Sequence, residues 1–373
     1  MNFEFSDEQN LLREQVQKFL REQCPPEKVR AVLDDVEMSH DAGLWQSIVD
    51  LGWTGVSIPE QYGGVGLGYL ELCVIAEELG RSLAPTPYAS SVYLATEALL
   101  LYGSEAQKQN YLPRLAAGEI VGTFAMAEGR RAPRPENLAT KLRDGKISGQ
   151  KLPVPDGDIA NFAVVLVRDE KASSLVIVDL ASEGVQRAAV ETLDPTRSQA
   201  RLDFTNAACE PLGDAGEGWQ QAQRLFDRAA VLFAFEQVGG AQASLEMARS
   251  YAMERYAFGR PIASFQAIKH KLADMYISST LARSNCYYGA WALSTDAPEL
   301  ALAAATARVT ATQAYDECAK ENIQTHGGMG FTWEFDCHMY FRRAKALAVN
   351  LGGLTGWQDR LVSALESTPP QEA

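Results

Sequence analysis

A chain of 373 residues, of which 46% are apolar, can bury a large core and is long enough for two or three domains. Its formal net charge of −14 disfavours nucleic acid and anionic membranes as partners, because phosphate binding needs a basic surface. The six cysteines are scattered without C-x-x-C or metal-ligand spacing, a pattern typical of buried thiols in a reducing compartment. The start is charged rather than signal-like, and no run is apolar enough to span a bilayer. We therefore expect a cytoplasmic protein without a metal site.

The first part of the chain, to about Leu115, has a helical pattern. Ser6, followed by an acidic and an amide residue, is typical of a helix N-cap, and apolar residues then recur at helical spacing. A second helix is predicted over 70–79, entered through the glycine-rich segment 62–68. These glycines do not form the G-x-G-x-x-G that follows a strand, so they predict a tight loop rather than a phosphate cradle.

Short β-rich runs separated by Gly, Asp, Glu and Pro occupy the middle of the chain, between about Ile120 and Leu212. No helix of useful length intervenes, which predicts an antiparallel β module rather than βαβ units. The clearest runs are 146–149, 162–167, 174–178 and 200–204.

Long alanine-rich helices are predicted from Gly218 to about Leu365, over 219–254, 263–294 and 300–324. The fold class is therefore mainly α with a central antiparallel β module. The predicted domains are an N-terminal helical domain (1–119), a β domain (120–212), a C-terminal helical domain (213–366) and a disordered tail (367–373).

Four local motifs follow one another along nearly the whole chain. They are IPEQYGG at 58–64 with EELG at 77–80; GSEAQK at 103–108 with YLP at 111–113 and AGE at 117–119; ERYAFGRPI at 254–262 with FQAI at 265–268 and LADM at 272–275; and QTHGGMGF at 324–331 with RRAK at 342–345. In these motifs the chain resembles the acyl-CoA dehydrogenase family. The resemblance implies that family's three-domain fold with a C-terminal four-helix bundle. It also implies FAD-dependent α,β-dehydrogenation of an acyl-CoA thioester in lipid β-oxidation.

Part of the third and fourth motifs has chemistry suited to a dinucleotide. A guanidinium matches phosphate oxygens, an aromatic ring can stack on adenine, and glycine lets backbone approach a ligand. Taken alone, the same residues also fit a solvated helix end, a core aromatic and a helix cap. The resemblance favours the first interpretation: the matching family residues contact the adenosine and pyrophosphate of an FAD across a dimer interface. These residues are Arg255, Phe258, Gln266, Gln324 and Gly328. His326 has no second histidine at ligand spacing and is interpreted as structural.

The general base of the reaction is missing from both positions that the family uses. A base near the α-carbon contributes roughly 10²–10⁴ in rate. The family places a glutamate either six residues after the lysine of the R-x-A-K segment or early in the first C-terminal helix. Here those positions hold Leu351 and Ala229. We therefore predict no catalytic residue on this chain.

Another carboxylate would have to replace the missing base. Asp227 matches a family residue on the CoA side, so it is a candidate substrate-binding residue that points away from the base position. Glu236, Glu334 and Asp336 are interpreted as structural or as partner contacts.

The residues expected beside the flavin ring are altered as well. The family carries a Thr-Glu pair whose threonine bonds the flavin; here Phe124 and Met126 lead into Ala127-Glu128. The following Gly-Ser-Asp turn is replaced by the shorter, arginine-rich segment 129–135, and Leu152-Pro153 stands where a tryptophan covers the ring. Leucine and proline side chains offer no hydrogen bond.

These losses suggest that the chain is a base-less partner subunit, as in heterotetrameric (α₂β₂) bacterial acyl-CoA dehydrogenases. It would contribute its adenosine half-site to a homologous catalytic chain. A self-sufficient dehydrogenase with a displaced base, as a homo-oligomer, and a flavin-dependent monooxygenase on the same fold remain as alternatives. The expected partners are an acyl-CoA substrate and, as electron acceptor, an electron-transfer flavoprotein.

Overall fold

The structure is a computed structural model that describes residues 5–35, 37–170 and 172–367, and its contacts divide the chain into two compact units. The helical unit comprises Met1–Glu27, Tyr69–Ala84 and Ala230–Ala373; the sheet unit comprises Lys28–Gly68 and Pro85–Ala229. The predicted boundaries at 119 and 212 follow the order of elements along the chain and stay a prediction. The predicted tail, after Ser367, lies outside the described residues.

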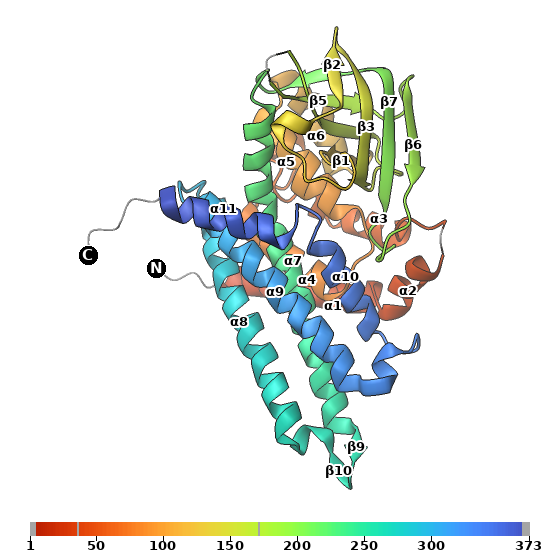
Figure 1. Cartoon of the computed structure of the whole chain (residues 1–373), viewed down its shortest axis with the longest axis vertical. Coiled ribbons are helices and arrows are strands. Elements are labelled where there is room, and N and C mark those ends of the chain that lie inside the picture. Colours follow the sequence, from red (N-terminus) through yellow and green to blue (C-terminus); the bar gives the residue numbers. More distant parts are fainter. Residues whose placement is uncertain (1–4, 36, 171, 368–373) are drawn as a thin grey trace, which may run out of the picture. The chain divides into compact units, whose positions relative to one another are not determined.

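The helical unit is built from long helices, and α7, α8 and α9 run alongside one another (Figure 1). Among the described residues no helix is both long and apolar enough to cross a membrane. The elements are α1 (Asp7–Gln23), α4 (Tyr69–Arg81), α7 (Gly218–Glu254, from Ala230 onward), β9 (Tyr256–Ala257), β10 (Arg260–Pro261), η5 (Ile262–Ser264), α8 (Gln266–Ser294), α9 (Leu300–His326), η6 (Gly327–Phe331), α10 (Cys337–Leu347) and α11 (Leu354–Ser367).

Local sequence explains how these helices begin and how closely they pack. At the start of α1 the Ser6 hydroxyl accepts the Gln9 N–H and the Gln9 side chain accepts the Ser6 N–H, which confirms the predicted cap. A Cβ added to Gly239 would lie 1.9 Å from the Glu77 carbonyl oxygen, so α4 and α7 approach to backbone contact only because glycine stands there.

Buried charges connect three helices of this unit. Glu77 on α4 accepts from Arg13 of α1 at 3.2 Å and from Arg283 of α8 at 2.6 Å. Next to it, burial and the charge of Glu77 raise the pKa of Glu78 to about 7. Both carboxylates are buried.

The sheet unit contains the β module and shorter helices. Its helical elements are α2 (Pro26–Asp34), α3 (Ala42–Asp50), η1 (Trp53–Gly55), η2 (Glu60–Tyr62), η3 (Ala89–Thr96), α5 (Glu97–Tyr102), α6 (Glu105–Ala116) and η4 (Pro135–Asn137). Its strands are β1 (Gly122–Ala125), β2 (Lys141–Arg143), β3 (Lys146–Pro155), β4 (Phe162–Val167), β5 (Ser174–Asp179), β6 (Val185–Ala189), β7 (Gln199–Ala208) and β8 (Glu210–Leu212). The four β-rich runs predicted from the sequence all fall within strands.

The strands form two sheets, in the orders β1-β4-β5-β8 and β2-β3-β7-β6, whose buried residues share one hydrophobic core. One part of the antiparallel prediction needs correction, because β1 pairs with β4 in parallel register, Gly122 opposite Phe162. β4 is buried along its whole length, and a strand buried on both faces has the same continuous apolar pattern in either orientation.

The glycine-rich segment 62–68 forms a tight loop, as predicted. Gly63 and Gly66 have φ of +77° and +66°, and a Cβ on Gly64 would lie 2.0 Å from the Ile58 carbonyl oxygen. The glycines therefore serve backbone packing.

Candidate functional site

The first group of predicted site residues lies where α7 ends. Arg255 continues the last turn of α7, its N–H donating to the Tyr251 carbonyl at 2.8 Å, and leads into the β9–β10 hairpin (Figure 1). Phe258 and Gly259 form the tip of this hairpin with φ of +53° and +80°. Positive φ is costly for a bulky residue. The Phe258 side chain is 95% exposed and meets the Phe265 ring edge-on.

The end of α9 is joined to the same place. His326, the last residue of α9, stacks on Tyr251 with ring centroids 4.1 Å apart, and Tyr251 lies one helical turn before Arg255. Lys271 near the start of α8 forms an ion pair with Glu321 of α9. The predicted residues of α7, α8 and α9 therefore gather at one end of the helical unit. We call this the helix-end region: Arg255, Phe258, Gln266, Gln324 and Gly328.

The helix-end region has the chemistry that a dinucleotide needs. The Arg255, Gln266 and Gln324 side chains are exposed, and within the described residues none of the three makes a hydrogen bond or ion pair. A Cβ on Gly328 would meet no atom within 4 Å. A free guanidinium, free amides and open backbone fit a diphosphate, and the exposed ring of Phe258 fits adenine stacking. These residues thus fit the adenosine diphosphate part of FAD.

His326 is buried and bonded within the protein, which fits its interpretation as structural. Its Nδ1 lies 2.8 Å from the Asn322 carbonyl oxygen, and burial lowers the pKa of the imidazole. Among the described residues no group of His, Cys, Asp and Glu could hold a metal ion. All six cysteines are unpaired.

The second group lies in the sheet unit, where β1 ends beside β3. Phe124 and Met126 are buried, and the Leu152 N–H donates to the Ala127 carbonyl at 2.8 Å. The two altered positions of the predicted flavin side are therefore direct neighbours. Neither side chain can donate or accept a hydrogen bond. We call this the strand-end region: Phe124, Met126, Ala127, Glu128, Lys151 and Leu152.

An ion pair that sequence reasoning missed holds the strand-end region together. Lys151 is completely buried, and its Nζ donates to Glu128 Oε1 at 2.7 Å and to the Met126 carbonyl at 3.2 Å. Burial lowers the pKa of Lys151 to about 8, although Glu128 opposes the shift. The ammonium is thus used within the protein, and no sequence signal marks this lysine as different from surface lysines.

Neither predicted base position can transfer a proton. Ala229 is fully buried within α7. Leu351 is buried, and its carbonyl accepts from Trp357 Nε1 at 3.2 Å. Glu236, one alternative base, is fully buried and its charge raises the pKa of Arg308 against the effect of burial.

Asp227 is buried on the first turns of α7, within the sheet unit. Its neighbour Phe226 contacts Phe124 with ring centroids 5.5 Å apart, which brings this turn of α7 next to β1. The next residue, Arg228, forms a buried ion pair with Glu97 that the sequence did not reveal. The predicted CoA-side residue and the strand-end region are therefore close together.

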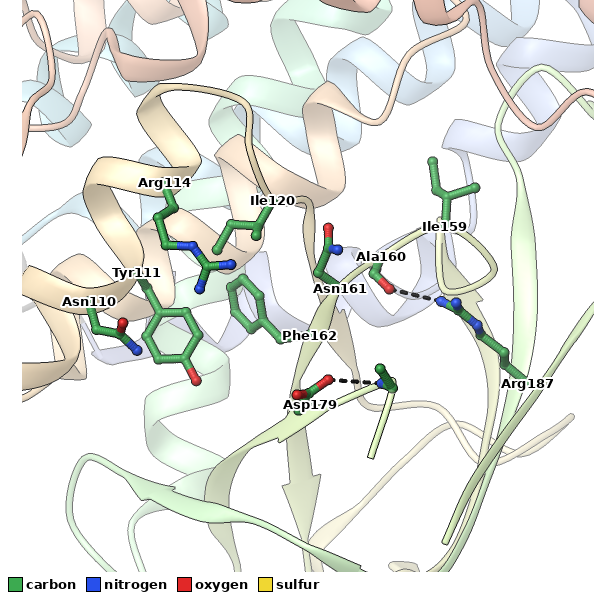
Figure 2. Close-up of a pocket in the computed structure, with 11 residues that line it drawn as sticks. Asn110, Tyr111, Arg114, Ile120, Ile159, Ala160, Asn161, Phe162, Asp179 and Arg187 are labelled. Atoms are coloured by element: carbon green, nitrogen blue, oxygen red, sulfur yellow. Dashed lines mark hydrogen bonds between the residues drawn. The ribbon is translucent and has the colours of Figure 1, made fainter. Parts of the chain in front are cut away.

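A separate hollow of about 460 Å³ opens on the sheet unit and contains none of the predicted site residues (Figure 2). Arg187 in its wall donates to the Ala160 carbonyl at 2.9 Å, and Asp179 accepts the Ala181 N–H. Its other lining residues include Arg114 and Tyr111 of α6 and Phe162 of β4. Both signs of charge and apolar rings face it, so the hollow specifies no class of ligand.

Two family models match the chain: the acyl-CoA dehydrogenase N-terminal domain over residues 6–119 and the acyl-CoA dehydrogenase C-terminal domain over residues 216–360. The chain is 33% identical over 345 residues to the acyl-CoA dehydrogenase IpdE2 of Mycobacterium tuberculosis, covering 92% of each protein. These matches include both segments that carry the helix-end region and the segment that carries Asp227.

Solved structures with the same fold include two-protein complexes. The chain superposes with a TM-score of 0.88 and 29% identity on a chain of the ChsE4–ChsE5 complex from Mycobacterium tuberculosis, covering 99% of this chain and 100% of that one. For a chain of a variant of the Tcur3481–Tcur3483 steroid ACAD, the TM-score is 0.87 and the identity 28%, with 96% and 98% covered.

Proposed function

This chain belongs to the acyl-CoA dehydrogenase family, whose members are FAD-dependent oxidoreductases acting on the CH–CH bond of acyl-CoA, and from that premise we propose that it is a base-less subunit. In this role it contributes the adenosine and pyrophosphate half-site for an FAD whose flavin ring and catalytic base belong to a homologous chain. When bound, FAD would supply the hydride acceptor for α,β-dehydrogenation of the thioester. This chain's own residues hold the cofactor's nucleotide end.

The observation that carries the proposal is the contrast between the two groups of residues. Arg255 and the two glutamines of the helix-end region present unused donors to solvent. In the strand-end region the donors that exist are used internally, as Lys151 is with Glu128. With alanine and leucine at both base positions, nothing beside the thioester on this chain would take the α-proton.

A self-sufficient dehydrogenase with a displaced base is the second candidate. It requires a carboxylate that can reach the substrate. Glu97 is instead used in a buried ion pair with Arg228, and Glu236 is fully buried. A monooxygenase on the same fold needs no such base. It would need side-chain contacts to the flavin ring, which Ala127 and Leu152 cannot make.

The proposed partners follow from the same role. The first is a homologous acyl-CoA dehydrogenase chain; the ChsE4–ChsE5 complex, to a chain of which this chain is similar, supports such a pairing. An electron-transfer flavoprotein is the proposed acceptor of electrons. The six unpaired cysteines support a reducing compartment such as the cytoplasm.

The experiment compares this chain alone with this chain co-expressed beside a homologous chain that keeps the glutamate and the Thr-Glu pair. Acyl-CoA-dependent reduction of an artificial electron acceptor is measured for both. We expect activity only from the co-purified complex, and a glutamate-to-glutamine change in the sister chain abolishes it. Desaturation by this chain alone, at a rate like that of the complex, would contradict the proposal.

A further inference from the structure

The loop that leaves the strand-end region carries an unusual local charge. Residues 129–138 include Arg130, Arg131 and Arg134, whereas the only carboxylate among them is Glu136. All three arginines are exposed, in a chain whose net charge is −14. A local basic surface in an acidic protein is a favourable place for a polyanion.

The side chains of these arginines make almost no contacts with charged or polar groups among the described residues. Within the described residues, Arg130 and Arg131 form no ion pair or hydrogen bond through their side chains. Arg134 lies 4.0 Å from Glu136, but both side chains are about 70% exposed. Exposed pairs of this kind contribute roughly 0–1 kcal/mol, so all three guanidinium groups are available to a ligand.

The loop that presents them is held at both ends. The Glu128 carboxylate accepts from the Ala139 N–H at 2.6 Å and the Thr140 N–H at 3.0 Å, so one side chain joins the start of the loop to its end. Glu128 is fixed in turn by the buried Lys151, and the Gly129 N–H donates to the Leu152 carbonyl at 2.7 Å.

The interior of the loop is ordered too. The Asn137 side chain accepts the Arg134 N–H at 2.8 Å and donates to the Ala132 carbonyl at 3.0 Å. Pro133 and Pro135 restrict the backbone further. A loop ordered before binding loses less conformational entropy when it takes a ligand.

The loop also begins at the right place for the substrate. It follows the strand-end region directly, and the Phe124–Phe226 contact brings the turn of α7 that carries Asp227 next to the same strand. The CoA part of an acyl-CoA is a polyanion, with a diphosphate and a 3′-phosphate. Guanidinium groups bind phosphate oxygens in bidentate fashion.

We infer that Arg130, Arg131 and Arg134 form a recognition site for the phosphates of CoA, so that this chain binds CoA although it cannot turn the thioester over. The inference rests on the proposed function in one respect, that the chain belongs to an acyl-CoA enzyme without having its own base. On this inference the chain lacks the base and the flavin contacts but still binds the nucleotide part of the substrate.

The test uses calorimetry to compare the binding of CoA with the binding of pantetheine, which lacks the phosphates. Both ligands are measured on this chain alone and on this chain co-purified with its sister chain. The variant is Arg130→Gln/Arg131→Gln/Arg134→Gln. Its matched control is Lys18→Gln/Arg21→Gln/Arg249→Gln, which removes three exposed basic residues elsewhere. We expect the loop variant to weaken CoA binding about tenfold or more, and added salt to weaken CoA binding to the wild type. Pantetheine binding and the control variant stay unchanged.

Two results would overturn the inference: CoA binding no tighter than pantetheine on the wild type, or equal CoA binding by wild type and loop variant. Equal CoA binding with weakened association to the sister chain would assign the loop to a protein contact instead. The FAD content of the complex is measured on the same samples. It tests the proposed function separately, because a failure of the CoA inference leaves the number of FAD molecules per chain unchanged.

Discussion

The helix-end and strand-end regions of this chain differ in whether their polar groups are bonded within the protein. In the helix-end region the polar and aromatic side chains are exposed, and Phe258 has a positive φ, which is costly for a bulky residue. In the strand-end region the polar groups are satisfied internally and the remaining side chains are apolar. The exposed groups of the helix-end region are bonded to water and stay available to a ligand, whereas the buried groups of the strand-end region bond one another and hold the fold.

The largest expected effect tests whether the strand-end region is a scaffold. Lys151→Met leaves the partly buried Glu128 carboxylate without its cation, and removing one partner of a buried pair costs up to roughly 3–5 kcal/mol. We expect the free energy of unfolding in urea to fall by that order. The double variant Lys151→Met/Glu128→Gln should recover part of the loss. A single variant as stable as the wild type would show that the pair does not hold the region.

The next effect concerns the scaffold of the helical unit and its pH dependence. The pKa of Glu78 is raised to about 7 in the folded chain, from about 4.5 in the unfolded chain. Because the folded chain holds the Glu78 proton more tightly than the unfolded chain, Glu78 contributes to the free energy of unfolding. This contribution is fully present below pH 4.5 and is lost as the pH rises through 7, by up to about 3 kcal/mol. Glu78→Gln should remove this slope between pH 4.5 and 7 in urea titrations. An identical slope in the variant would contradict the assignment to Glu78.

A moderate effect is expected from the helix-end region itself. Arg255→Ala removes a charge-assisted contact to the diphosphate, of roughly 1.5–3 kcal/mol, so FAD should bind roughly 10- to 100-fold more weakly to the complex. Arg249→Ala, another exposed arginine on α7, is the matched control and should leave FAD binding unchanged. Fluorescence titration of the flavin-free complex measures both. Equal affinities would remove Arg255 from the half-site.

The smallest effect separates binding from folding at one residue. Phe258→Gly removes the ring from a position with φ of +53°, which glycine adopts freely. We expect the melting temperature to stay the same or rise slightly, while FAD affinity falls by about 1 kcal/mol, roughly fivefold, for the lost stacking. If stability and affinity both fall, Phe258 is part of the core of the hairpin and not a contact to the adenine.

Local patterns explain how much the sequence could predict. The Ser6 cap, the four β-rich runs and the long C-terminal helices depend on neighbouring residues, and the structure confirms them. The parallel pairing of β1 with β4 was not predictable, because an apolar run has no orientation. The burial of Lys151 depends on Glu128, which is distant along the chain.

The candidate site divides in the same way. The motifs placed Arg255, Phe258, Gln266, Gln324 and Gly328 in one predicted half-site, and the structure brings the elements that carry them to one end of the helical unit. Their contacts with FAD stay a prediction. The contacts that hold the loop of residues 129–138 were not predictable from the sequence. They join the Glu128 carboxylate to the Ala139 and Thr140 N–H groups, which lie at the far end of the loop.

The number of FAD molecules per chain tests the central claim most directly. This chain is co-purified with a homologous chain that keeps the glutamate and the Thr-Glu pair, and flavin absorbance is compared with the amount of each chain. One FAD for each pair of chains, none on this chain purified alone, and loss of FAD from the pair on Arg255→Ala are the predicted results. One FAD for each chain, or an FAD-loaded and active chain without a partner, would contradict the account.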